Sequence, residues 1–186
     1  LMQEASVKTK SSMAAVMGLS KEQIEELCEK TEGYLALANI NSPGQIVVSG
    51  DMGAIDAAEA AAKDMGAKRY IKLPVAGAFH SEIMRPAAEG MAAVISDFEI
   101  NDASVPVVSN VTAEETVKAE EIKELLIKQI VSPVRWVESI EYMKSKGVVK
   151  FIEAGPGAVL SGLIKKADRS LECVNIDKFE DLKKIG

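Results

Sequence analysis

His80 is the only histidine among the 186 residues, so any acid–base chemistry that uses an imidazole depends on it. It stands in a glycine-containing loop just after a strand-like run, where proteins often carry catalytic groups. From position alone, a surface histidine without a role is an equally good interpretation. A base also needs a nucleophile, and the sequence holds no G-x-S-x-G motif, the strand-to-helix turn that exposes a reactive serine.

The two cysteines supply neither that nucleophile nor a metal site. Cys28 falls on the apolar face of an expected helix and Cys173 in an expected strand, so both are interpreted as packing residues. No C-x-x-C pair and no nearby histidine accompany them, so we expect no metal site and no disulfide framework. Gly155-Pro156-Gly157, between a strand and a helix, could bind an anion through backbone N–H groups, but a plain turn is the better interpretation.

Composition limits the classes of function. Lys and Arg number 22 against 28 Asp and Glu, and the net charge of −6 does not favour nucleic acid as a partner. No apolar run approaches the roughly 20 residues of a membrane-spanning helix, and no signal peptide is visible. We therefore expect a soluble protein of the reducing cytoplasm, with no membrane partner and no cofactor.

Residues 12–75 carry the most regular pattern. Strands are expected at residues 12–17, 34–40, 45–49 and 68–75, with a helix after the first and another after the third. Ser20 and Gln23 have the spacing of a helix capping box, and Asp51 can cap the second helix. The order β-α-β-β-α-β predicts a split-βαβ, ferredoxin-like unit.

Beyond Pro74, helical and strand-like segments continue to alternate. Strands are expected at residues 105–111, 148–153 and 171–176, and helices after Pro86 and at 119–130, 133–146 and 158–166. Pro133 is expected in the first turn of its helix, where its missing N–H costs nothing. This alternation predicts an α/β fold in which the strands belong to a parallel sheet whose other strands lie outside the sequence.

Taken together, these segments resemble one family, the malonyl-CoA:acyl carrier protein transacylases, which load the extender unit in bacterial fatty acid synthesis. The resemblance runs from Leu1 to about Ile176, and its motifs keep the family's order. They are LMQEA (1–5), MAAV (13–16), ANINSPGQIV (38–47), LPV (73–75) leading to FHS (79–81), SNV (109–111), SPVRW (132–136) and EAGPG (153–157). Each motif alone is weak, but so many in register make chance a poor explanation.

The resemblance implies an α/β-hydrolase-like core with an inserted ferredoxin-like subdomain, which agrees with the β-α-β-β-α-β pattern. On this sequence the subdomain is expected at residues 10–75. The C-terminal part of the core is expected at residues 1–9 and 76–186.

The resemblance also implies catalytic roles. In that family a serine attacks the malonyl thioester, and His80 matches the histidine that moves the proton. Gln129 matches the residue whose main-chain carbonyl orients that histidine. The family's serine, its oxyanion-hole loop and its carboxylate-binding arginine precede the position of Leu1. We therefore expect this chain to be the C-terminal part of a longer enzyme and to be inactive alone.

Substrate and partner contacts follow from the same resemblance. Asn39, Asn41 and Gln45 match positions near the coenzyme A or pantetheine arm, and Lys68 and Arg69 match a basic pair that meets the acidic carrier protein. The expected partners are thus malonyl-CoA and acyl carrier protein, and the complete protein is expected to be a monomer.

Two other functions fit the same residues. An acyltransferase of polyketide synthesis would use another acyl-CoA, although Phe79 adds a ring before His80 where malonyl-selective relatives often have one. A non-catalytic module that binds coenzyme A or the carrier protein would need no serine.

Overall fold

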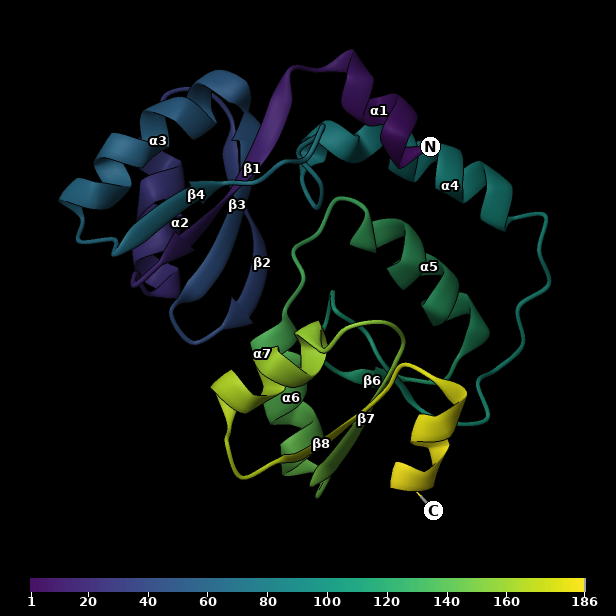
Figure 1. The fold of residues 1–186 in the computed structure, drawn as a ribbon. Coiled ribbons are helices and arrows are strands. Elements are labelled where there is room, and N and C mark those ends of the chain that lie inside the picture. The colour runs from purple at the N-terminus through teal and green to yellow at the C-terminus, as the bar shows by residue number, and fades with distance from the viewer. Residues whose placement is uncertain (186) are drawn as a thin grey trace.

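The computed structural model describes residues 1–185, a mixed α/β arrangement whose largest sheet has four antiparallel strands in the order β2-β3-β1-β4. These strands are β1 (Ser11–Met17), β2 (Leu35–Ser42), β3 (Gln45–Asp51) and β4 (Arg69–Lys72). Helices α2 (Lys21–Lys30) and α3 (Met52–Asp64) pack on one face of this sheet (Figure 1). The chain order β1-α2-β2-β3-α3-β4 is the order expected from the sequence.

Local sequence signals explain where these elements begin. The capping box is confirmed: the Ser20 N–H donates to Gln23 Oε1 at 2.9 Å, and the Gln23 N–H donates to Ser20 Oγ at 3.3 Å. The prediction for Asp51 is wrong in its chemistry. It stands at the N-cap of α3 without capping it, because its Oδ2 accepts the Tyr34 N–H at 3.1 Å and ties β3 to the start of β2 instead.

The central strand β1 divides the core into two sides. Ala14 and Val16 point toward α2 and α3, whereas Met13 and Ala15 point to the opposite side, because successive side chains of a strand alternate between its faces. On that opposite side Phe79 packs against the sheet. The loop that carries His80 therefore lies on the face that the two helices leave free.

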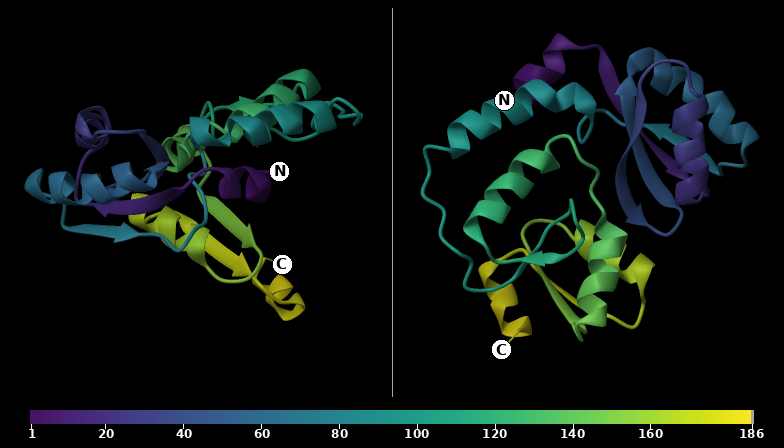
Figure 2. Two further views of the ribbon diagram at one scale, coloured as in Figure 1. Left: turned by 90° about the horizontal axis from the view of Figure 1, so that it is seen from above. Right: turned by 180° about the vertical axis from the view of Figure 1, so that it is seen from behind.

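The second half of the chain consists mainly of helices, of which α6 (Trp136–Ser145) and α7 (Val159–Ala167) pack with a small parallel sheet. Further elements of this half are α4 (Arg85–Ile95), α5 (Ala119–Gln129), β7 (Lys150–Ala154) and β8 (Glu172–Ile176). β7 and β8 pair in parallel and are joined by α7, in agreement with the parallel sheet expected for this part of the chain. The N-terminal helix α1 (Met2–Lys8) contacts α4 (Figures 1 and 2).

Three predicted elements differ from the structure, and the first is the strand predicted at residues 68–75, of which β4 covers only Arg69–Lys72. The helix predicted from Pro133 begins at Trp136, because the Val134 backbone is extended and bridges the edge of β2. The Val134 N–H donates to Ala38 O at 2.8 Å, and Val134 O accepts the Ile40 N–H at 2.9 Å. These bonds to a distant strand outweigh the local preference of proline for a first helical turn.

The strand predicted at residues 105–111 is limited to β5 (Val107–Val108), which pairs with β6 (Glu115–Thr116). The chain turns after Val108, since the Ala113 N–H bonds to Ser109 O at 2.8 Å and Ala113 has a φ of 58°. Short 3₁₀ helices at η1 (Glu82–Met84) and η2 (Phe179–Lys184) and the helix α1 were not predicted.

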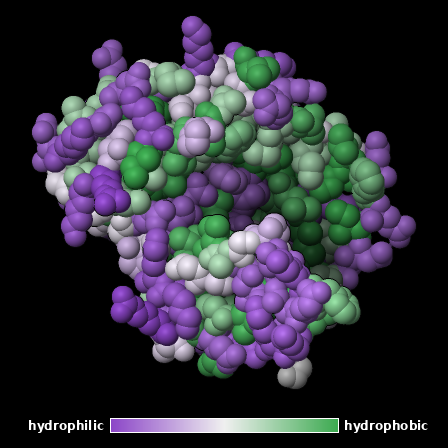
Figure 3. Space-filling view, viewed as in Figure 1, coloured by the Kyte–Doolittle hydropathy of each residue, from purple (hydrophilic) through white to green (hydrophobic). Residues whose placement is uncertain are grey.

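Figure 3 shows a hollow in the middle of one face, with hydrophobic side chains on part of its wall.

None of the helices described between residues 1 and 185 is long and apolar enough to cross a lipid bilayer.

Candidate active site around His80

His80 lies in the loop between β4 and η1 and lines a cleft of about 430 Å³. Its φ of 58° falls in the left-handed region, which residues other than glycine rarely adopt. The cleft is formed by side chains from α1, β1, β2, β3 and this loop: Met2, Met13, Asn39, Asn41, Val47, Leu73, Phe79 and His80. The site thus combines one imidazole and two amides with an otherwise apolar wall.

The imidazole of His80 is oriented by a main-chain carbonyl. Its Nδ1 lies 3.1 Å from Gln129 O, and the Gln129 side-chain Nε2 lies 3.5 Å from the same nitrogen. That amide also donates to Ser132 O at 3.0 Å. Because a carbonyl oxygen can only accept a hydrogen bond, the shorter contact, to Gln129 O, requires Nδ1 to be the donor. Nδ1 therefore carries the proton, and Nε2 keeps a free lone pair on a ring that lines the cleft.

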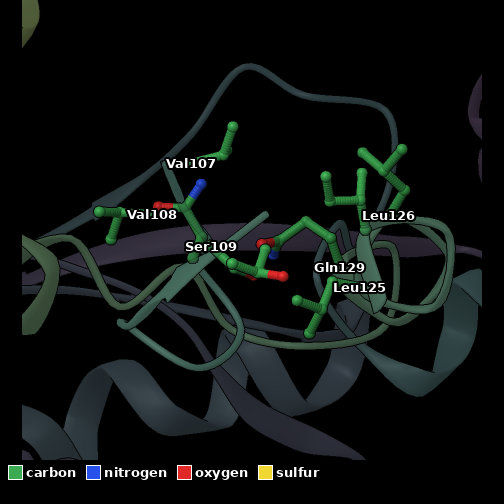
Figure 4. Close-up of a pocket in the computed structure, with 9 residues that line it drawn as sticks. Val107, Val108, Ser109, Leu125, Leu126 and Gln129 are labelled. Carbon is green, nitrogen blue, oxygen red and sulfur yellow. The ribbon is translucent and has the colours of Figure 1, made fainter. Parts of the chain in front are cut away.

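Gln129 can offer its carbonyl because it is the last residue of α5. The last carbonyls of a helix have no intrahelical donor, and they form the negative end of the helix dipole. The Gln129 side chain also borders an apolar cavity of about 180 Å³ between α5 and the segment at residues 107–110 (Figure 4). In Figure 4, Leu125 and Leu126 of α5 face Val107 and Val108 across this cavity.

Asn39 and Asn41 reach the cleft because alternate residues of β2 share a face. Gln45 does not line the cleft, since its Oε1 accepts a hydrogen bond of 3.0 Å from Lys166 Nζ near the β2–β3 turn. The structure thus brings His80, Gln129 and the two asparagines together, and it leaves Gln45 apart.

Four apolar residues that line the cleft were not predicted as site residues from the sequence: Met2, Met13, Val47 and Leu73. The alternation in β1 and β3 shows which residues share a face, but which face meets the histidine loop depends on the pairing of distant segments. Met2 gave no such signal, because it belongs to the unpredicted helix α1.

The cysteines are not activated nucleophiles. Burial raises the pKa of the Cys28 thiol to about 11, and Cys28 packs on the helix side of the sheet, away from His80. Burial also raises the pKa of Cys173, which belongs to the core between β7, β8 and α7. Because the thiolate is the reactive form, both shifts oppose reaction at neutral pH.

The loop at Gly155-Pro156-Gly157 is a turn whose neighbouring helix end is already occupied. The carboxylate of Glu153 accepts the N–H groups of Leu160 at 2.9 Å and Ser161 at 2.8 Å, in the first turn of α7. Hydrogen bonds from the N–H groups of Ser161 and Leu160 lower the pKa of Glu153. An internal anion thus takes the place that an external one would need.

Comparison with known proteins places this geometry in context. Residues 1–183 match the family model described as an acyl transferase domain. The chain is 46% identical over 184 residues to the malonyl CoA-acyl carrier protein transacylase of Bacillus subtilis, covering 97% of this chain and 58% of that protein. It is 44% identical over 186 residues to the protein of the same name from Staphylococcus aureus, covering 98% of this chain and 60% of that protein.

Solved structures give the same picture. An acyl carrier protein S-malonyltransferase from Vibrio cholerae superposes with a TM-score of 0.95 at 38% identity, covering 100% of this chain and 61% of that one. A malonyl-transacylase in complex with a type II PKS acyl-carrier protein superposes with a TM-score of 0.93 at 35% identity, covering 98% of this chain and 60% of the other. The chain thus spans about three fifths of the length of these relatives.

Proposed function

Because the chain belongs to the family of acyl transferase domains, we propose that it works as part of a malonyl-CoA:acyl carrier protein transacylase of fatty acid synthesis. The observation that carries this proposal is the imidazole of His80, whose Nδ1 is bound by Gln129 O while Nε2 is left free in a cleft. The names of the relatives at 44–46% identity support the same reaction.

The chemistry assigned to His80 is proton transfer in two half-reactions. A serine outside these 186 residues attacks the thioester carbonyl while Nε2 accepts its hydroxyl proton; the C–S bond then breaks, and the proton passes to the coenzyme A thiolate. In the second half-reaction Nε2 takes the proton of the carrier's thiol. The sulfur attacks the acyl-serine ester, and the proton returns to the serine oxygen. Gln129 O holds the ring in the tautomer that both halves require.

We assign the substrate contacts on the same basis. Asn39 and Asn41 line the cleft beside His80, which supports a role in binding the pantetheine arm of coenzyme A through amide hydrogen bonds. Gln45 lies outside the cleft lining and is proposed only as a contact for a more distant part of coenzyme A.

The domain division is part of the proposal. Residues 10–75 contain the four-stranded sheet with its two helices, which supports a ferredoxin-like subdomain. The parallel pair β7-β8 joined by α7 supports assigning residues 1–9 and 76–186 to an α/β-hydrolase-like core.

Malonyl transfer by the whole protein and by the 186-residue chain tests the proposal directly. We expect the whole protein to move malonyl from coenzyme A to carrier-protein thiol, and the chain alone to move none, because it has no G-x-S-x-G serine. Transfer by the purified chain would contradict the proposal.

The relative solved with a type II PKS carrier favours a second candidate, an acyltransferase of polyketide synthesis. Competition between malonyl-CoA and methylmalonyl-CoA on the whole protein measures which acyl group it prefers.

A whole protein that binds the carrier without transferring any acyl group would indicate the third candidate, a non-catalytic module.

For the carrier protein we propose a docking surface at the end of the sheet where β1 meets the β2–β3 turn. Arg69 pairs with Met17 across β1 and β4, and the Gly18 N–H bonds to Gly44 O at 2.9 Å, so Lys68 and Arg69 lie close to this turn.

The same turn borders a groove of about 580 Å³. Pro43 of the turn lines it together with three cations at the end of α7: Lys165, Lys166 and Arg169. Among the described residues, none of these five cations forms an ion pair within 4.0 Å, and Lys165 and Lys166 donate only to neutral oxygens. No carboxylate neutralises their charges, which supports binding of an acidic partner.

Reversing two of these charges tests the docking surface. We expect Arg69→Glu with Arg169→Glu in the whole protein to raise KM for carrier protein about tenfold at low salt, while KM for malonyl-CoA stays unchanged. Lys30→Glu, at the C-terminal end of α2, reverses a charge outside this surface and serves as the control; both KM values are expected to stay unchanged. Equal KM values for carrier protein in the double variant and the wild type would exclude this surface.

A further inference from the structure

Two buried serine hydroxyls converge on Ala78, two residues before His80. Ser11 Oγ accepts the Ala78 N–H at 3.1 Å, and Ser81 Oγ donates to Ala78 O at 2.6 Å. Ser11 is 3% exposed, Ser81 is 2% exposed, and Ala78 is fully buried. Both polar groups of one peptide position are therefore held by side chains, one from β1 and one from the loop itself.

Each serine is itself anchored. Ser11 pairs with Asp51 in the sheet, and its hydroxyl donates to Thr9 O at 3.2 Å. Ser81 O accepts the Met84 N–H at 2.9 Å, which ties Ser81 to η1. Phe79, between Ala78 and His80, packs into two hydrophobic clusters, one on the sheet and one around Met84.

These anchors explain how His80 keeps its φ of 58°. A strained backbone conformation persists only where the surroundings hold it on both sides. Ala78 on one side and Ser81 on the other are fixed by hydrogen bonds, so the backbone between them has little freedom. The same fixed backbone aims the imidazole at Gln129 O, 49 residues further along the chain.

We propose that Ser81, supported by Ser11, is a positioning residue that holds His80 in the left-handed conformation and its imidazole in the Nδ1-protonated tautomer. Neither serine lines the cleft, so both act through the histidine. The consequence for catalysis rests on the proposed function. The consequence for the imidazole does not, and it can be measured on this chain.

The single histidine makes the measurement direct. In the chain labelled with ¹⁵N-histidine, nitrogen NMR of the neutral ring is expected to report Nδ1 protonated and Nε2 unprotonated. In Ser81→Ala the Nε2-protonated tautomer is expected to become populated, because the ring is no longer held with Nδ1 against Gln129 O. Ser81→Thr keeps the hydroxyl and restores the wild-type spectrum.

The matched control is Ser139→Ala. Ser139 is 3% exposed, and its hydroxyl also donates to a nearby carbonyl, Arg135 O at 2.8 Å, but it lies in α6 away from the loop. Its removal is expected to leave the tautomer unchanged. Should Ser81→Ala fail to fold, Ser11→Ala provides the same readout, and an unchanged tautomer in the folded variant overturns the proposal.

Activity adds a second readout in the whole protein. Ser81→Ala is expected to lower kcat about tenfold with KM for malonyl-CoA unchanged. The reason is that Asn39 and Asn41 stay in place for binding, whereas the imidazole of His80 loses its orientation. A shifted tautomer in Ser81→Ala, together with a whole wild-type protein that transfers no acyl group, would contradict the proposed function and leave the positioning role intact. An unshifted tautomer in an otherwise active enzyme would do the reverse.

Discussion

Replacing His80 by Ala in the whole protein is expected to lower the rate of malonyl transfer by about 10²-fold or more. A positioned general acid–base group contributes roughly this factor, and these 186 residues hold no second histidine to replace it. Both half-reactions lose the same base, so formation of the acyl-enzyme and its resolution by the carrier thiol both slow. Single-turnover transfer from labelled malonyl-CoA measures each step.

A parallel variant separates chemistry from backbone strain. His80→Gly adopts a φ of 58° without strain, whereas Ala at this position does not. Both variants are expected to be inactive to a similar degree, and added imidazole is expected to restore part of the activity of His80→Gly, where the space of the ring is open. Wild-type rates in either variant would remove His80 from the mechanism.

Replacing Gly50 by Ala is expected to destabilise the chain by about 3 kcal/mol, a large fraction of the stability of a domain of this size. A Cβ at Gly50 would lie 2.1 Å from Tyr34 O and 3.0 Å from Leu35 Cα. Both atoms are backbone and cannot rotate away. Tyr34 O also accepts the Asp51 N–H at 2.9 Å, so relief of the clash would break the start of the β2–β3 pairing. Urea unfolding followed by circular dichroism measures the loss.

Gly53 offers the matched control because the chemical change is identical and the surroundings are open. A Cβ at Gly53 meets nothing within 4 Å, and Gly53 lies in the first turn of α3. Gly53→Ala is expected to leave stability unchanged or to raise it by up to about 1 kcal/mol. If Gly50→Ala proved as stable as Gly53→Ala, the close packing of β2 against β3 would be wrong.

Much of the fold could be predicted because its signals are local. The capping box of Ser20 and Gln23 and the hairpin turn before Gln45 depend on residues that are neighbours in the chain. Failures occurred where a distant segment intervened. Val134 forms backbone bonds to β2, and these override the helix that Pro133 favours.

The candidate site divides in the same way. His80 could be identified as the only imidazole, but a motif cannot show that its Nδ1 meets Gln129 O, and that pairing came from resemblance to a family. The apolar wall of Met13, Val47 and Leu73 depends on which face of the sheet receives the histidine loop. Strand alternation leaves that choice open.

By itself, the sequence determined the order of strands and helices between Ser11 and Lys72 and the one imidazole that can move a proton, since helix caps, turns and residue chemistry are local properties. Only the tertiary structure decided how that side chain is aimed. The Gln129 carbonyl at the end of α5 accepts from Nδ1 of His80, and Ser11 of β1 holds the backbone N–H of Ala78. These contacts join residues 49 and 67 positions apart in the chain, and such contacts exist only once the chain has folded.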